Sequence, residues 1–341
     1  MKTNLKKLLY SGVTLMSLVV LAACSSTSSS TTTSSSAATS QTSVATISNN
    51  STSSDSSSST IDWSALPTTE VTLSNDGLKI TEGGTYILTG STTAGVTVET
   101  DANVRIILAG AEISSSDTAA INVINADNVE LEIKDGTTNT VKDTSNHTDT
   151  NIEGAIHVEA DLTITGNGSL TVEGNFQDGI VSTDDLIVNS GNITVTAVDD
   201  GIRGKDSLTI NGGTINVIAG GDGIKSTNDT DTTKGYTTIT GGEITVKAGD
   251  DAINAASTTS SEIFIKVTGG DLKVAVGSGD TDAFDANGDI YISGGTIDVT
   301  AQSAFDFDGT AELTGGTVTV NGEQITQITA TGPGAGGHGG W

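Results

Sequence analysis

The sequence predicts an all-β fold, a parallel β-helix of about nine turns with about 22 residues in each turn. Three observations predict this fold. A short segment recurs along the chain at a nearly fixed spacing, apolar and polar residues alternate between its copies, and no stretch shows the 3.6-residue apolar period of a helix. The alternative, a β-sandwich of short strands, does not predict equivalent residues at a fixed period.

The recurring segment ends in an apolar residue. Its copies are Thr118-Ala-Ala-Ile121, Glu153-Gly-Ala-Ile156, Gln177-Asp-Gly-Ile180, Asp199-Asp-Gly-Ile202, Gly221-Asp-Gly-Ile224, Asp250-Asp-Ala-Ile253, Thr281-Asp-Ala-Phe284 and Gln302-Ser-Ala-Phe305. The step from Asp178 to Asp200, and again to Asp222, is 22 residues, and polar insertions at 226–235 and 255–261 lengthen later steps. Since equivalent residues stack about 4.8 Å apart, the apolar ends should form an inward ladder. A second inward ladder should consist of Ser182, Gly204, Ser226, Ala255 and Ala286.

The first sixty residues predict a secretion signal followed by a tether. A short basic head precedes an apolar run over residues 8–20, which is too short to span a membrane. The run ends in Leu21-Ala-Ala-Cys24, which resembles the bacterial lipobox, and Cys24 is the single cysteine of the sequence, so it has no disulfide partner. The alternative is a plain signal peptide with an incidental cysteine.

We therefore divide the chain into four parts. Residues 1–23 are the signal peptide, 24–60 a Ser/Thr-rich disordered linker that starts at the acylated Cys24, 61–331 the β-helix, and 332–341 a flexible Gly-rich tail. This organisation predicts an extracellular lipoprotein, attached through palmitate on Cys24 to the outer face of a cell membrane. A Gram-positive bacterium is the favoured source, and Cys24 is the predicted membrane contact.

The charge of the chain restricts its partners. The formal net charge is −28, and removal of the signal takes away three lysines and no acidic residue, which leaves −31. Such a field excludes nucleic acid and anionic membrane surfaces as partners. An anionic ligand would therefore need a bridging cation, and we expect the protein to be a monomer.

One column of acidic residues is difficult to explain by packing. Aspartate occupies the same position on five consecutive turns, and stacked carboxylates about 4.8 Å apart repel one another unless a cation neutralises them. Two oxygen ligands on opposite sides of one Ca²⁺ lie about 4.6–5.2 Å apart, which matches the rung spacing. The candidate calcium ligands are Asp178, Asp199, Asp200, Asp222, Asp250, Asp251, Asp282, Asp285 and Asp306. The alternative is that the aspartates cap turns by accepting local backbone hydrogen bonds.

Zinc and copper are less suitable for this column, because oxygen ligands dominate it and the three histidines, His147, His157 and His338, are scattered in the sequence.

Outward positions beside the aspartates supply candidate glycan contacts. They are Arg203, Lys205, Lys225, Asn254 and Asn287. Arg203 and Lys225 admit three roles, which we rank as pairing with sugar carboxylates, balancing the neighbouring aspartates, and removing a C5 proton in β-elimination. The third role is the least favoured, because a basic residue with an ordinary pKa is protonated at neutral pH.

The run Asp199-Asp-Gly-Ile-Arg-Gly-Lys205 and the run Gly221-Asp-Gly-Ile-Lys-Ser226 lead into strands of the type Leu208-Thr-Ile-Asn-Gly-Gly-Thr-Ile215. Over roughly residues 70–320 this pattern resembles a family of bacterial secreted carbohydrate-binding domains. The resemblance implies a right-handed, single-stranded parallel β-helix similar to pectate lyases, calcium binding, and an association with acidic sugars. The acidic positions of the motif correspond to Asp199, Asp200, Asp222, Asp250, Asp251 and Asp282.

The sequence therefore predicts calcium-dependent binding of an acidic, uronate-type polysaccharide at the cell surface. One alternative is a pectate-type polysaccharide lyase that acts by β-elimination. The other is a surface adhesin or scaffold in which calcium only stiffens the solenoid.

Overall fold

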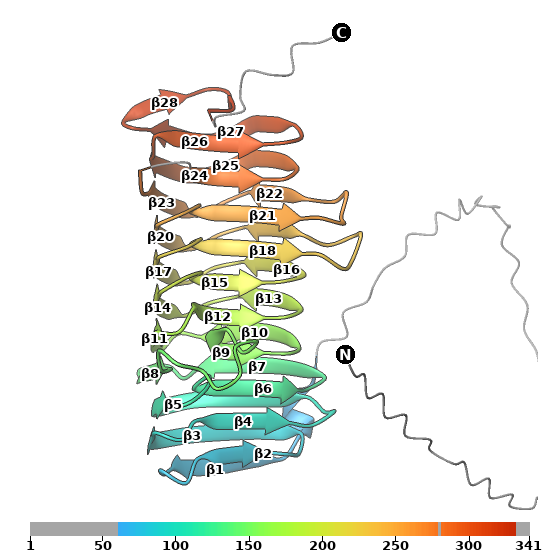
Figure 1. Cartoon of the computed structure of the whole chain (residues 1–341), viewed down its shortest axis with the longest axis vertical. Helices are drawn as coiled ribbons and strands as arrows, with labels where there is room; N and C mark the ends of the chain where they lie inside the picture. The colour runs from blue at the N-terminus through green and yellow to red at the C-terminus, as the bar shows by residue number, and fades with distance from the viewer. Residues whose placement is uncertain (1–60, 279–280, 332–341) are drawn as a thin grey trace, which may run out of the picture. The chain divides into compact units, whose positions relative to one another are not determined.

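The computed structural model describes residues 61–278 and 281–331, and these residues form a parallel β-solenoid with three strands in a typical turn (Figure 1). The predicted signal peptide, the predicted lipidation site Cys24, the predicted linker and the Gly-rich tail lie outside the described residues. In the described part the helical structure is the 3₁₀ turn η1 (Trp63–Ala65). Within this part no helix has the length and apolarity needed to cross a membrane.

The first face is a ten-stranded sheet, and about nine turns separate its first strand from its last. Its strands are β2 (Leu78–Ile80), β4 (Val96–Glu99), β6 (Ile121–Asn125), β9 (Gly154–Val158), β12 (Asp178–Ser182), β15 (Ile202–Gly204), β18 (Ile224–Asn228), β21 (Ile253–Ser257), β24 (Asp282–Ala286) and β26 (Ser303–Phe307). All these strands pair in parallel, as a β-helix requires.

The other two faces belong to one 18-stranded sheet, because four long strands turn a corner and pair on both faces. The long strands are β3 (Gly84–Thr92), β5 (Val104–Ser114), β25 (Asp289–Thr300) and β27 (Ala311–Val320). The second face also contains β1 (Thr68–Leu73), β7 (Asn128–Ile133), β10 (Asp161–Gly166), β13 (Asp185–Val188), β16 (Ser207–Ile210), β19 (Tyr236–Ile239) and β22 (Phe264–Val267). The third face also contains β8 (Thr138–Lys142), β11 (Ser169–Gly174), β14 (Asn192–Ala197), β17 (Thr214–Ala219), β20 (Glu243–Ala248) and β23 (Asp271–Val276).

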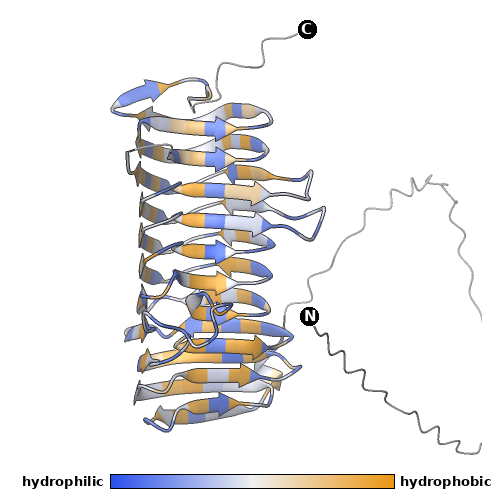
Figure 2. Cartoon of the chain, viewed as in Figure 1, coloured by the Kyte–Doolittle hydropathy of each residue, from blue (hydrophilic) through white to orange (hydrophobic). Residues whose placement is uncertain are grey.

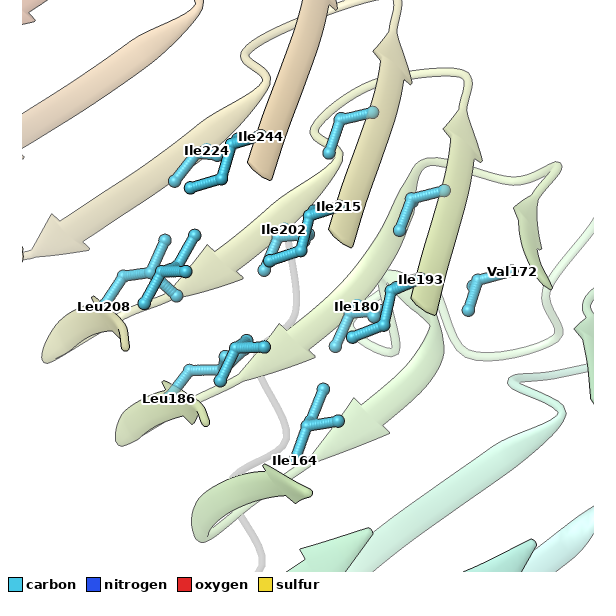
Figure 3. Packing of buried hydrophobic residues seen from close by; sticks show 14 of the residues in the cluster. Ile164, Val172, Ile180, Leu186, Ile193, Ile202, Leu208, Ile215, Ile224 and Ile244 are labelled. Carbon is cyan, nitrogen blue, oxygen red and sulfur yellow. The ribbon is translucent and has the colours of Figure 1, made fainter. Parts of the chain in front are cut away.

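The predicted inward ladder is confirmed by the strand register. The aligned residues are Ile121, Ile156, Ile180, Ile202, Ile224, Ile253, Phe284 and Phe305, all of which are buried. Figure 3 shows Ile180, Ile202 and Ile224 facing the interior, where they meet side chains of the third face such as Ile193 and Ile215. The alternation of apolar and polar residues along the strands is visible in Figure 2. The stacked core excludes the β-sandwich alternative.

The second ladder of small residues is also confirmed, from Ser182 through Gly204, Ser226 and Ala255 to Ala286. The two polar insertions become loops after β18 and after β21, which project from the solenoid in Figure 1. Strand pairing ends at β28 (Glu323–Ile325), which pairs antiparallel with β27 and closes the last turn.

Glycine within the recurring segment has a packing reason. A Cβ atom on Gly201 would lie 2.3 Å from Val217 Cγ1 and 2.5 Å from the Gly223 carbonyl oxygen, and Gly179 and Gly223 are equally crowded. The missing side chain therefore lets the first-face strands approach the third face closely. This approach fixes the corner at which the aspartates stand.

Candidate functional site

The predicted aspartate column is a continuous structure at the corner that precedes the first-face strands. We call its five members, Asp178, Asp200, Asp222, Asp251 and Asp282, the aspartate ladder. Oδ1 of each of the first four accepts a hydrogen bond from the backbone N–H of the next member, at 3.1, 2.9, 2.9 and 2.7 Å. Four members are buried and Asp251 is half-buried. The donors belong to the next turn, so these Oδ1 atoms join successive turns and do not cap local turns as the alternative interpretation expected. The Oδ2 atoms of the same four residues face the outward column of side chains.

The outward column comprises Arg203, Lys225, Asn254, Asp285 and Asp306, which align in register on five successive strands. Its first two members neutralise the beginning of the ladder. Arg203 Nη2 lies 2.6 Å from Asp178 Oδ2 and also pairs with Glu153. Lys225 Nζ lies 2.6 Å from Asp222 Oδ2 and 3.2 Å from Asp200 Oδ2. Both cations balance protein carboxylates.

These pairs set the protonation of the groups that form them. Burial, opposed by Arg203 and assisted by Asp200, raises the pKa of Asp178 to about 7. Burial, opposed by Lys225, raises the pKa of Asp222 to about 6. The pKa of Lys225 is raised because the attraction of Asp200 and Asp222 outweighs its own burial. The pKa of Arg203 is likewise raised by Asp178 and Glu153. Neither basic residue can serve as a neutral proton acceptor in this setting.

Beyond Lys225 the outward column has no basic residue. Asn254 Nδ2 donates to Asp251 Oδ2 and to Asp285 Oδ2, both at 3.0 Å, while the buried Asn254 Oδ1 has no hydrogen-bond partner. Burial, followed by repulsion from Asp251, raises the pKa of Asp285 to about 8. Asp282 and Asp306 add to this repulsion. The ladder therefore ends in a section where carboxylates outnumber cations.

Carboxylates also gather at the middle of the ladder. One oxygen each from Asp222, Asp250 and Asp251 lie within 4.8 Å of one another, a spacing that a single cation can bridge. Asp199 is exposed and lies one turn before Gly221. A Cβ atom on Gly221 would lie 2.4 Å from Asp199 Oδ1, so the missing side chain at Gly221 leaves room for this carboxylate. The donor set consists of carboxylate and amide oxygens, which suits Ca²⁺ and not a thiolate- or imidazole-binding metal.

Two predicted glycan contacts lie elsewhere. Lys205 follows the end of β15 and Asn287 follows the end of β24, so both stand at the corner after the first face, whereas the ladder stands at the corner before it. Lys205 is half-exposed and Asn287 is exposed. Asp306 remains on the outward column, and its Oδ1 accepts from the Phe307 N–H at 2.9 Å. The structure thus separates Lys205 and Asn287 from the ladder.

The structure adds an element that the sequence pattern did not show. Residues 143–153 form a loop in which the buried His147 Nε2 lies 3.0 Å from Asp143 Oδ2 and the ring stacks on Phe176. At its end, Glu153 pairs with Arg203 and donates its backbone N–H to His157 Nδ1 at 3.3 Å. Burial lowers the pKa of His157 to about 4. His147 thus lies in this loop and His157 on β9, which follows it directly, and His338 lies outside the described residues. The long step from Ile121 to Ile156 was the available signal of this insertion.

The chain is similar to known proteins in sequence and in fold. A family described as carbohydrate-binding domain-containing protein matches residues 74–333. A protein of that same description from Acetivibrio thermocellus is 33% identical over 135 residues, which are 37% of this chain and 47% of the relative, so the match spans about half of the relative's length.

A solved structure, described as the polysaccharide lyase-like protein from C. thermocellum as its gadolinium derivative, is also similar. The sequence identity is 28% and the TM-score is 0.55, over 74% of this chain and 96% of the solved chain.

The charge balance of the ladder predicts the effect of removing Arg203. In Arg203→Met, Asp178 and Glu153 lose their partner, and we expect the free energy of unfolding to fall by about 3–5 kcal/mol, as for other broken buried pairs. Lys79→Met is the matched control, because it breaks the exposed pair with Glu99 and should cost about 1 kcal/mol or less. Urea unfolding measures both changes, and equal losses would contradict the structural role of Arg203.

Proposed function

Since the chain belongs to the family of carbohydrate-binding domain-containing proteins, we propose that it binds acidic, uronate-type polysaccharide through calcium at the bacterial cell surface. Polysaccharide binding in general is supported by the family and by the lyase-like fold of the solved relative. The finer assignment to calcium and uronates rests on the charge pattern of the ladder.

One observation carries the calcium assignment. Past Lys225, Asp251 and Asp285 converge on the side chain of Asn254, whose buried carbonyl oxygen has no partner. A half-turn of the Asn254 amide would direct its oxygen toward the same point as the two carboxylate oxygens. Three oxygens would then face one position, and Asp222, Asp250 and Asp251 offer a second set nearby. Calcium held there would supply the positive charge that an anionic glycan needs near this acidic chain.

A lyase is the second candidate, because the solved relative is described as lyase-like. Proton abstraction from a uronate requires a neutral base, and Arg203 and Lys225 are each held as cations by two carboxylates. Binding without β-elimination is therefore the favoured function. Formation of unsaturated uronide from polygalacturonate by the purified chain would overturn this choice.

The binding proposal is tested by retention on immobilised polygalacturonate, with calcium and again with a chelator. We expect retention in calcium that is lost on chelation, and we expect Asp251→Asn combined with Asp285→Asn to weaken it by at least about tenfold, because ligands of the ion are removed. Asp271→Asn combined with Asp298→Asn is the matched control, with the same pair of substitutions on exposed third-face residues. Calcium that raises the melting temperature of a chain that retains no glycan would favour the scaffold alternative.

The protonation of Asp285 predicts a pH dependence. Its carboxyl is neutral below a pKa of about 8, whereas calcium requires the carboxylate, so binding at pH 7 should release a proton and the affinity should rise from pH 6 to pH 8. Calorimetry at pH 7 in two buffers of different ionisation heat measures this release. We expect Asp285→Asn to abolish it, and an affinity that is unchanged between pH 6 and pH 8 would contradict the involvement of Asp285.

The cell-surface part of the proposal rests on the lipobox-like run that ends at Cys24. We expect Cys24→Ala to remove labelled palmitate from the protein and to release it from the membrane fraction into the medium. Palmitate incorporation that persists in this variant would overturn the anchor.

A further inference from the structure

We infer that a uronate residue of the polysaccharide is seated on the third face, next to the aspartate ladder, with Lys247 holding its carboxylate and with Val198 and Ile218 holding the apolar face of its ring. This inference rests on the proposed function and adds a specific seat to it. None of these three residues was among the contacts expected from the sequence.

The first observation is the distribution of exposed apolar side chains. Among the described residues, the large apolar side chains that are clearly exposed are Ile124, Val198 and Ile218, at 44%, 60% and 53% exposure. Ile218 aligns with Thr196 on the neighbouring strand, and Val198 follows two residues later, so these two apolar side chains are diagonal neighbours on one surface. Sugar rings present C–H groups on one face, and packing of this face on apolar side chains is favourable because it removes apolar surface from water.

The second observation is an available cation at the same place. Lys247 aligns directly with Ile218 on the adjacent strand, and it is exposed. Arg203 and Lys225 are each occupied by two carboxylates, whereas Lys247 has no ion pair among the residues that the structure describes. A ligand carboxylate can therefore pair with Lys247 without displacing a carboxylate of the protein.

The third observation is the bare backbone between these side chains and the ladder. Gly220 and Gly249 occupy the positions that follow β17 and β20, as Val198 follows β14. A Cβ atom on Gly220 would lie 2.1 Å from the Val198 carbonyl oxygen, and one on Gly249 would lie 2.1 Å from the Gly220 carbonyl oxygen. No side chain fits at Gly220 or Gly249, and we call these two positions the glycine shelf. A sugar on Lys247 and Ile218 therefore meets no side chain of the shelf on the way to the exposed carboxylate of Asp250.

The three observations together define a ligand with one negative charge and one apolar face. The glycine shelf separates Lys247 from the carboxylates of Asp222, Asp250 and Asp251, which offer the calcium position. A uronate can form an ion pair with Lys247 and still approach the calcium position, whereas a neutral sugar can form no ion pair with Lys247.

The test measures glycan affinity and calcium binding separately, on the chain without residues 1–24. We expect Lys247→Gln to weaken the affinity for oligogalacturonate by about tenfold, with the number of bound calcium ions unchanged. We also expect Val198→Thr combined with Ile218→Thr to weaken the affinity severalfold, since both side chains are exposed and the fold does not depend on them. Lys266→Gln is the matched control, because this exposed lysine lies on the second face of the next turn.

The outcomes distinguish the seat from the proposed function. If the wild-type chain binds oligogalacturonate and both the Lys247 and the Val198/Ile218 variants bind equally well, the seat is overturned and calcium-dependent binding stands. If Lys266→Gln weakens binding as much as Lys247→Gln does, the seat is overturned as well, because the effect is one of net charge. If the wild-type chain binds no oligogalacturonate at all, the proposed function fails and the seat fails with it.

Discussion

The parallel stacking of equivalent residues is the constraint on which the rest of the structure depends. Each turn places its side chains about 4.8 Å from their counterparts on the next turn, so a residue type that recurs in the sequence forms a continuous stack along the solenoid. For isoleucine this produces a continuous core from Ile121 to Ile253, which two stacked phenylalanines extend. For aspartate the same stacking forces like charges together, and the fold must neutralise them. The Oδ1 atoms are used by backbone N–H groups of the next turn, which leaves the charge at Oδ2 to be balanced from outside.

The balance of charge changes along the ladder, from a section neutralised by the protein's own cations to a section in which carboxylates outnumber cations. Arg203 and Lys225 are cations that belong to the protein, and they satisfy Asp178, Asp200 and Asp222 without any ligand. The next members of the same column are Asn254, Asp285 and Asp306, which bring hydrogen bonds and further negative charge. Burial, together with this excess of negative charge, raises the pKa of Asp285 to about 8, so the unligated protein holds a proton there at neutral pH. A section that is balanced by a proton is one in which a metal ion can take the proton's place.

The fold and the inner ladders could be predicted from the sequence, because a fixed period with alternating polarity has one compact solution. The aspartate column could be predicted for the same reason. The sequence did not show which side chains would form ion pairs with one another. Pairs such as that of Arg203 with Glu153 join residues of different turns, and a loop of variable length lies between them in the sequence. Lys205 and Asn287 were expected as outward glycan contacts because of their spacing in the motif, and the strands β15 and β24 carry them to the corner after the first face, away from the ladder. Ile218 is exposed at an outward position of β17, and Val198 is exposed just after the end of β14, beside Gly220.

The surroundings of the basic residues Arg203, Lys225 and Lys247 give a reason for ranking binding above catalysis. A lyase needs a neutral base beside the metal, and the basic residues of the outward column, Arg203 and Lys225, are fixed as cations by their carboxylates. Lys247 has no ion pair among the residues that the structure describes, and it lies across the glycine shelf from the ladder, so we assign it the pairing with a ligand carboxylate and not a part in proton abstraction beside the metal. The same arrangement provides a charged contact, an apolar contact and a place for an ion along one edge of the solenoid. These are the elements on which the proposal of uronate binding without β-elimination rests.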